Sequence, residues 1–527
     1  MPPLKTYLTN KNIFLFGLFL VIVGMPLSKF LMSVGQFLLL ANWIFEGDFK
    51  RKWQVMKTSK VLWVVSGFYL LHLVGLLWTS DFAYAANDLK IKLPLLWFPL
   101  LFITSKHEIS KKEIESLLWF FTTSVFIASI VCTMVWLGYT KHKVVDIRDI
   151  SIFNSHIRFA LMIDLVICFL LYDFFKTGNL FLYVLKIALI TWLIVFLGIM
   201  QSFTGIVILA VVLVFYSLLF LKKLRKPFLK ISAFTLMGIV ASFIIYLVIK
   251  EIKEQQVPAK QVNRLYQTKN GNYYYNDLLN NEVENGNLIW TNICVKELES
   301  NWNTRSSINF LDKDKKGNPI NSTLIRYMSS KGLNKDAEGI YALTDKDVGL
   351  IEEGITNYLY TNKSGLENRI HEFIYEYEAF KRGKNPTGHS FLMRLEFWRI
   401  GWQIFKRNPI YGVGTGDMQR AYNNQYKISG TKLSEDWWKR SHNQFMAVTI
   451  GFGIIGLVVF LFYLFYPPIN IKNKHYLFSA FFIISLLSML NEDTLETQAG
   501  VTFFGFFFGF LMFVDSTKNG ANIENNS

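Results

Sequence analysis

The sequence has few charged residues, few cysteines and few histidines for its length. Of its 527 residues, 18% are charged, three are cysteine and eight are histidine, whereas 52% are hydrophobic and 48 are phenylalanine. Water-soluble domains cannot bury so many long apolar runs. Cys132 and Cys168 lie inside such runs and Cys294 is alone in the large polar region, which excludes a disulfide framework there. The composition predicts an all-α polytopic membrane protein, because a lone bilayer-crossing segment must satisfy its own backbone hydrogen bonds.

The N-terminal apolar run lacks the features of a cleavable signal peptide. The stretch KNIFLFGLFLVIVGMPLSKF has no small-x-small cleavage site, and a second apolar run follows at once. We therefore expect it to be the first membrane span. The sequence also lacks paired repeats, which are frequent in secondary transporters.

Twelve apolar runs are candidates for spans of a bilayer core about 30 Å thick. The loops 46–60, 105–113, 176–180, 222–230 and 467–474 hold 16 lysines and arginines, whereas the other short loops hold four. By the positive-inside rule the first set of loops faces the cytoplasm, so residues 251–441 lie on the outer side. The expected spans are 12–27, 29–45, 60–79, 89–104, 115–138, 156–175, 181–200, 203–221, 229–250, 442–466, 475–490 and 499–514.

We expect five parts along the chain. These are spans 1–9 in residues 1–250, a partly helical extracytoplasmic insertion in 251–380, a basic interfacial part in 381–441, spans 10–12 in 442–514 and a cytoplasmic tail in 515–527. The insertion has 15 basic and 19 acidic residues, whereas residues 381–441 have 12 and four. A basic segment beside the membrane suits an anionic substrate at the outer leaflet.

The centre of the basic part predicts an amphipathic helix at the membrane surface. The stretch HSFLMRLEFWRIGWQIFKRNPIYGVGTGD, 389–417, includes Arg394 and Arg399, and Asn408-Pro409 would end the helix. Guanidinium groups bind phosphate oxygens in pairs and keep their charge, which suits a diphosphate. Alternatively, both arginines only anchor the helix to lipid headgroups. The predicted apolar stripe consists of Leu395, Trp398, Trp402 and Phe405.

Two further motifs follow this helix. Gly412, Gly414 and Gly416 come after a helix rather than a strand, so they indicate a tight turn packed closely on another element, not a nucleotide-binding loop. His442 stands at the beginning of the long apolar run in KRSHNQFMAVTIGFGIIGLVVFLFYLFY, 439–466, where we expect a helix to begin. The imidazole is either a polar cap at the water interface or a base that acts on a substrate at the same depth.

Together these motifs resemble the O-antigen ligase and polymerase family. The resemblance lies in Arg394, Trp398, the NP-x-x-G-x-G-x-G turn, His442-Asn443 and the following GIIG. It implies a fold like that of C-type membrane glycosyltransferases, with about 12 helices and one large extracytoplasmic loop. It also implies transfer of a glycan from a polyprenyl diphosphate to an acceptor hydroxyl, with inversion and with no metal or cofactor. His442 would match the family's essential histidine, and Arg394 an arginine that holds the diphosphate.

The resemblance places the protein in the bacterial inner membrane, with the large loop on the periplasmic side. Its partners would be a polyprenyl-diphosphate-linked glycan donor, a lipid A core or glycan acceptor, and membrane lipid, with no nucleic acid. Among the residues in and beside the motifs, the resemblance suggests substrate-binding roles for Arg399, Trp398 and Asn443.

The sequence departs from the family at one position. The family often has a second arginine that binds the diphosphate, and Phe203 stands at the matching position here. Arg158 is our preferred replacement, with His156 beside it to orient it, since a charge about one turn into a membrane helix is costly and usually functional. Arg158 could also simply extend to the surface. The other candidate cations are Lys90, Lys92, Lys143, Arg148 and Arg399.

The sequence leaves several alternatives open. The acceptor could be a lipid A core, another lipid-linked repeat or a protein. A transporter or flippase is a second class, for which Asp164 and Lys186 are the intramembrane ionisable residues. A diverged, inactive member that binds glycan through its insertion is a third.

Overall fold

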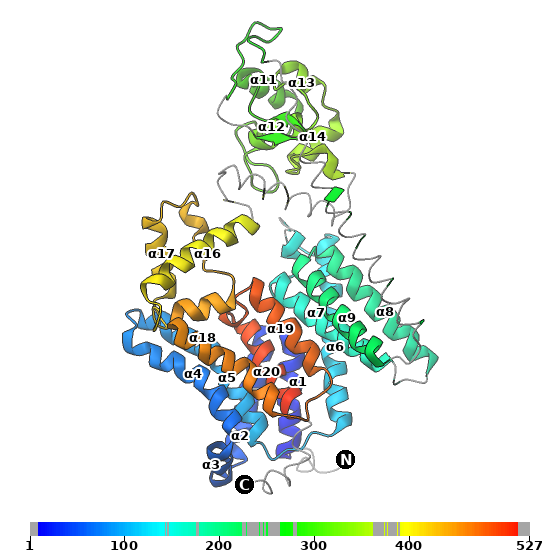
Figure 1. The fold of residues 1–527 in the computed structure, drawn as a ribbon. Helices are drawn as coiled ribbons and strands as arrows, with labels where there is room; N and C mark the ends of the chain where they lie inside the picture. Colours follow the sequence, from blue (N-terminus) through cyan, green and yellow to red (C-terminus); the bar gives the residue numbers. More distant parts are fainter. Residues whose placement is uncertain are drawn as a thin grey trace. The chain divides into compact units, whose positions relative to one another are not determined.

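The computed structural model of the chain is mainly helical (Figure 1). It describes residues 9–142, 147–174, 179–223, 264–277, 282–361 and 390–514, with a few single positions between these ranges. The chain forms two compact units, residues 1–219 with 393–527 and residues 220–392, and each is described on its own. Eleven of the expected spans coincide with described helices, whereas the expected span 229–250 lies outside the described residues.

The helices of the first unit follow the expected spans closely. Their bounds are α1 (Asn10–Leu27), α2 (Lys29–Phe45), α3 (Phe49–Thr58), α4 (Lys60–Val74) continued by η2 (Gly75–Trp78), α5 (Phe82–Thr104), α6 (Lys111–Trp136), η3 (Ile147–Ile150), α7 (His156–Phe174), α8 (Leu180–Ile199), α9 (Phe203–Lys223), α16 (Ser390–Arg407), α17 (Met418–Ile428), η5 (Glu435–Trp437), α18 (Gln444–Asn470), α19 (Phe478–Asn491), η6 (Thr494–Glu496) and α20 (Gln498–Phe513). Many of these helices begin after a residue whose side chain accepts a hydrogen bond from the first turn, and this explains why they begin where they do. These caps are Thr9, Ser28, Ser59, Asp81, Ser110, Asn179, Asn443 and Thr497.

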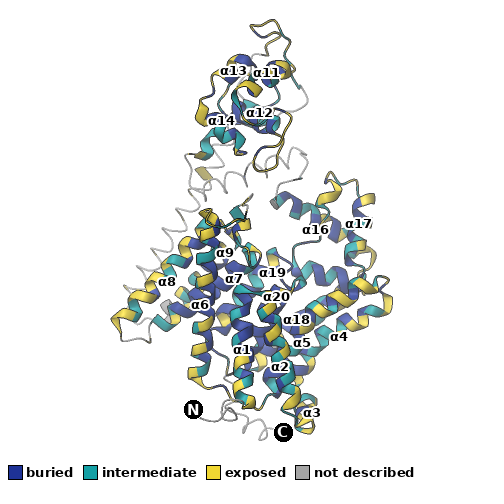
Figure 2. Ribbon diagram, turned by 180° about the vertical axis from the view of Figure 1, so that it is seen from behind, coloured by how far each residue is buried: buried dark blue, intermediate teal, exposed yellow. Residues whose placement is uncertain are grey.

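Among the described residues, five helices are long and apolar enough to cross a membrane, or six if α2 and α3, bent by 106°, count as one span. The five are α1, α4 with η2, α6, α8 and α18, whereas Phe203–Leu219 of α9, together with α19 and α20, are apolar but shorter. Helix α8 has an exposed side (Figure 2). Large apolar residues lie on that side, as on a lipid-facing surface. The exposed residues of α8 include Leu180, Phe181, Val184, Ile187, Ile194 and Val195. These features are consistent with a polytopic membrane protein, and the count of twelve spans stays a prediction.

Helix α20 lies at the core of this unit. Every residue from Ala499 to Phe513 is buried, and its phenylalanines pack against rings of α5, α6 and α19. A helix that is apolar all round is buried all round, which explains why so many phenylalanines occur in one short segment. The fixed position of α20 also fixes the residues 491–497 just before it.

The second unit contains the insertion. It has the short strands β1 (Val283–Glu284) and β2 (Asn287–Leu288), the helices α11 (Val295–Arg305), α12 (Ile320–Ser330), α13 (Ala337–Tyr341) and α14 (Asp345–Glu352), and η4 (Tyr358–Thr361). Trp302 and Tyr327 are fully buried in its own apolar core. A capping box between Thr344 and Asp347 begins α14. Cys294 is buried, and all three cysteines are free.

Candidate active site

His442 lies just before α18, in a strained backbone conformation. The expected helix start at His442 is wrong by two residues: α18 begins at Gln444, and Asn443 is its N-cap. The Asn443 side chain accepts a hydrogen bond from the Met446 amide and donates one to the Leu490 carbonyl at 2.8 Å. His442 has φ 46°, a left-handed conformation that is uncommon for a residue other than glycine. Its ring is therefore not the helix cap, and the surrounding contacts must hold it in place.

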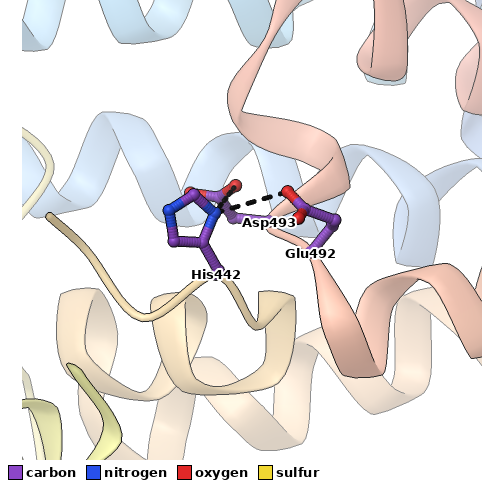
Figure 3. A group of neighbouring side chains, drawn as sticks. All are labelled: His442, Glu492 and Asp493. Atoms are coloured by element: carbon purple, nitrogen blue, oxygen red, sulfur yellow. Dashed lines mark hydrogen bonds and ion pairs between the residues drawn. The ribbon is translucent and has the colours of Figure 1, made fainter. Parts of the chain in front are cut away.

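Two carboxylates from the segment between α19 and α20 face the His442 ring (Figure 3). Nδ1 of His442 lies 3.4 Å from Oε2 of Glu492 and 3.8 Å from Oδ1 of Asp493. Both carboxylates are largely buried, whereas the His442 side chain is 30% exposed. Sequence reasoning missed these two acids. The signal that could have found them is NEDTLE, a cluster of acids between two apolar runs on the expected outer side.

Arg394 reaches the same place from α16. Its guanidinium donates to Oδ1 of Asn491 at 2.5 Å and contacts Oε1 of Glu492 at 2.7 Å. Trp398, one turn further along the same face of α16, donates from Nε1 to the carbonyl of Ser441 at 2.8 Å. The structure therefore brings Arg394, Trp398, His442 and Asn443 together around one segment.

Other predicted residues lie apart from this group. Arg399 pairs within α16 with Glu396 at 2.6 Å, so it is already engaged away from His442. His156 is the first residue of α7. The face of α16 that packs into the protein is also displaced from the predicted stripe, because its buried residues include Met393, Phe397, Ile400 and Ile404. Trp402, predicted to be on the apolar stripe, is 52% exposed.

Arg158 lies at the beginning of α7, close to Glu492. Its guanidinium donates from Nη1 to Oγ of Ser155 at 2.8 Å, whereas its Nε is buried and has no hydrogen-bond partner among the described residues. The positive charge of Arg158 is one of the influences that lower the pKa of Glu492. A buried, unsatisfied N–H on a guanidinium is costly unless a ligand completes its bonding.

Phe203, where the family arginine would stand, begins α9. The next residue, Thr204, accepts a hydrogen bond at 2.9 Å from Asn491, which also binds Arg394. Helices α7 and α9 pack tightly just beyond this point, since a Cβ on Gly205 would lie 2.6 Å from Cβ of Ala160. Arg158 and Phe203 are thus on neighbouring helix ends that both border Asn491 and Glu492.

The glycine turn packs its backbone directly on α18. The amides of Val413 and Gly414 donate to the carbonyls of Ile450 and Gly451 at 3.0 and 2.8 Å. α18 is broken at Gly453, where φ is 65°, and a Cβ on Gly412 would lie 2.4 Å from the Gly451 backbone. The predicted close approach is confirmed. The turn supplies hydrogen bonds at the place where the helix loses its own, and so stabilises the start of α18 beside His442.

Opposing influences set the ionisation of the two carboxylates. Burial raises the pKa of Glu492, but the hydrogen bond to His442 and the charges of His442, Arg394 and Arg158 outweigh burial, so its pKa falls below the ordinary value. Burial also raises the pKa of Asp493, and there the opposing charges of Arg440 and His442 are insufficient, so its pKa stays above the ordinary value. The site therefore combines one strongly paired carboxylate with one that is weakly compensated.

His442, Glu492 and Asp493 also offer three ligand atoms within 4.8 Å of one another, close enough for one metal ion. However, Arg394 and Arg440 already bind these carboxylates, at 2.7 and 3.7 Å. A divalent cation would have to approach both guanidinium groups. This charge pattern fits an imidazole–carboxylate pair better than a metal centre.

Comparison with known proteins agrees with the motifs. Residues 353–461 match the family model described as O-antigen ligase. This stretch includes Arg394, the glycine turn and His442, but neither α7 nor the acidic segment 491–497. No curated protein matches the chain. The match confirms, over these residues, the resemblance drawn from the motifs.

Proposed function

We propose that the protein transfers a glycan from a polyprenyl diphosphate carrier to an acceptor hydroxyl on the outer face of the bacterial inner membrane. The observation that carries the proposal is the pairing of Nδ1 of His442 with Glu492 at 3.4 Å, because it leaves Nε2 as the ring nitrogen for a substrate. A carboxylate at Nδ1 favours the tautomer in which Nε2 is unprotonated and can accept a proton. The acceptor hydroxyl is a poor nucleophile until a base removes its proton.

In the proposed step, Nε2 of His442 takes the proton as the hydroxyl oxygen bonds to the anomeric carbon. The bond from that carbon to the diphosphate oxygen breaks, and its electron pair leaves with the lipid diphosphate. Attack from the face opposite the leaving group inverts the anomeric centre. The proton remains on the imidazole, where the Glu492 carboxylate stabilises the imidazolium. Neither a metal nor a cofactor takes part.

Arg394 and Arg158 are the proposed diphosphate-binding residues. Arg394 would exchange the Glu492 carboxylate for a phosphate oxygen, and this exchange leaves Glu492 free to interact with the developing imidazolium. The unsatisfied Nε of Arg158 supports its assignment as the second arginine. Trp398 and Asn443 hold the His442 segment, and their contacts favour positioning rather than direct substrate binding.

The first experiment is complementation of the native host with wild type, His442→Ala and His142→Ala, each shown by blot to reach the membrane. His142 is an exposed loop histidine and serves as the matched control. We expect His442→Ala to abolish the surface glycan pattern and His142→Ala to preserve it. Accumulation of lipid-linked polymer would identify a ligase, and accumulation of single repeats a polymerase. An unchanged pattern in His442→Ala would refute the proposal.

A rescue experiment tests Arg158. We expect Arg158→Ala to lose transfer and the double variant Arg158→Ala with Phe203→Arg to recover part of it, because Phe203→Arg restores the cation at the family position. Arg264→Ala, which removes an exposed arginine of the second unit, is the control. Normal activity of Arg158→Ala would remove Arg158 from the site.

The contacts of the ionisable residues inside the apolar helices support the transport alternative less well than the site around His442 supports glycan transfer. Lys186, one of the two intramembrane charges that favoured it, pairs with Asp173 at 2.7 Å and so has a structural explanation. Asp164 is fully buried, and neither carboxyl oxygen has a hydrogen-bond partner among the described residues. Asp164→Asn therefore tests the transport alternative. Unchanged glycan transfer in that variant would show that transfer does not depend on this intramembrane acid.

A further inference from the structure

Arg440, two residues before His442, reaches into a buried group of charges. Its Nη1 donates to the Tyr84 hydroxyl at 2.9 Å and lies 3.1 Å from Oε2 of Glu496, and its Nη2 lies 3.7 Å from Oδ2 of Asp493. The Arg440 side chain is 19% exposed. A guanidinium can bridge three oxygens in this way because its donors are fixed in one plane.

Glu496 joins this group to three parts of the fold. Its carboxylate also binds Lys92 of α5 at 3.1 Å, and Lys92 in turn binds Asp88 at 2.6 Å. The Gln444 side chain donates to Glu496 at 3.3 Å and accepts from the Leu495 amide at 2.7 Å. Arg440 therefore anchors the segment 439–443 to α5 and to the residues before α20, at the point where His442 adopts its left-handed conformation.

Arg440 also determines how many unbalanced carboxylates face the imidazole. Asp493 lies between Arg440 and His442: its carboxylate is 3.7 Å from the Arg440 guanidinium and 3.8 Å from Nδ1 of His442. Removing the guanidinium would leave His442 as the nearest partner for the Asp493 charge. The charged groups around the ring come from its own segment, from the α19–α20 segment, from α16 and from α7, and they are Arg440, Glu492, Asp493, Glu496, Arg394 and Arg158.

We propose that Arg440 is a positioning residue for the base: it anchors the backbone that carries His442, and it supplies counter-charge to Asp493, which weakens the pull of this carboxylate on a proton at the imidazole. The role of the base rests on the proposed function. The charge relation between Arg440, Asp493 and His442 does not, because it concerns the protein without substrate.

The test measures the reactivity of His442 in the purified full-length protein in detergent. Diethyl pyrocarbonate modifies the unprotonated imidazole, and mass spectrometry of the peptide that contains His442 gives the rate at each pH. We expect Arg440→Gln to move the midpoint of this profile upward by roughly 1 to 3 pH units, the usual effect of an opposite charge within about 4–6 Å. Arg440→Lys, which keeps the charge, should move it less.

The double variant Arg440→Gln with Asp493→Asn separates the charge effect from misfolding. We expect its profile to return toward that of wild type, since the unbalanced carboxylate is gone. Lys439→Gln is the matched control, because Lys439 is the adjacent basic residue, is exposed and stacks on Trp437 instead. An unshifted profile in Arg440→Gln, or no return in the double variant, would overturn the proposal.

Transfer by the same variants is then measured with lipid-linked glycan from host membranes. We expect the acidic limb of the pH profile of transfer to rise with the reactivity profile. If the reactivity profile shifts while His442→Ala still transfers glycan, the Arg440 proposal stands and the proposed catalytic role of His442 fails.

Discussion

Replacing Glu492 by glutamine is the most direct test of the imidazole–carboxylate pair. Glutamine keeps the size and hydrogen-bonding capacity of the side chain but removes its charge, so Arg394 retains a neutral partner. Two unit charges 3.4 Å apart interact by about 5 kcal/mol at an effective dielectric constant of 20. That value is an upper bound, because Arg394 competes for the same carboxylate at 2.7 Å.

A hydrogen bond to a charged group typically contributes about 1.5–3 kcal/mol. We therefore expect Glu492→Gln to raise the barrier by about 2 kcal/mol, which slows transfer roughly thirtyfold. Because the variant removes a negative charge from the imidazole, the acidic limb of its pH–rate profile should move to lower pH. This shift is opposite to that expected for Arg440→Gln.

The assay is the initial rate of glycan transfer by purified protein, with the lipid-linked donor extracted from host membranes. Glu435→Gln, at an exposed position in η5, is the matched control and should transfer normally. A rate within twofold of wild type, or an acidic limb that moves upward, would refute the role given to Glu492. A loss caused only by weaker folding would lower the rate equally at every pH and leave the limb in place.

Three further predictions concern the backbone, the insertion and metal ions. Gly453→Ala should destabilise the protein and abolish transfer, because the φ of Gly453 is 65° and the new Cβ would lie 2.1 Å from the Ile410 carbonyl oxygen. Gly67→Ala in α4 is the control. Its new Cβ meets no atom within 4 Å, so thermal unfolding should show it to be neutral or slightly stabilising. Burial raises the pKa of Asp347, but hydrogen bonds, the first from Lys331, outweigh it and lower the pKa from 3.8 to about 2. Asp347→Asn should therefore cost about 2 kcal/mol of stability at neutral pH. This difference is fully present above pH 3.8 and disappears as the pH falls toward 2, which chemical denaturation followed by tryptophan fluorescence can measure. Chelation with EDTA should leave transfer unchanged, and a loss that added divalent metal restores would show that the histidine and its two carboxylates hold an ion.

The membrane helices were predictable because lipid imposes a simple requirement on them. Each expected span needed only a long apolar run, and the described helices follow these runs to within a few residues at most ends. The helix at 442–466 was the instructive error. Its apolar pattern is the same from Gln444 onward, but the polar side chain of Asn443 determines where the helix begins, and the motif did not show which of two adjacent polar residues would be the cap.

The active-site carboxylates were harder to predict because they come from a segment about 50 residues away in sequence. Motif spacing connected Arg394, Trp398 and His442, which all lie within the stretch that matches the family. Glu492 and Asp493 lie outside it, and only the packing of α20 brings their segment beside α18. The choice of Arg158 had a physical basis in the sequence, namely a charge within an apolar helix, and the structure adds a buried, unsatisfied Nε and an effect of its charge on Glu492.

The balance of charge around His442 links the separate proposals. Without substrate, Arg394 binds Glu492 and Arg440 binds Asp493, and the imidazole of His442 supplies counter-charge to both carboxylates as well. A lipid diphosphate brings new negative charge to Arg394 and Arg158. Arg394 then binds a phosphate oxygen in place of Glu492, so Glu492 loses this partner. Glu492 then faces His442 at the moment when a proton must move there, whereas Arg440, deep in its own group of buried charges, keeps its contact with Asp493. The same substrate that needs the base would thereby increase the proton affinity of that base, and a single substitution on either side of the ring should disturb this coupling in opposite directions.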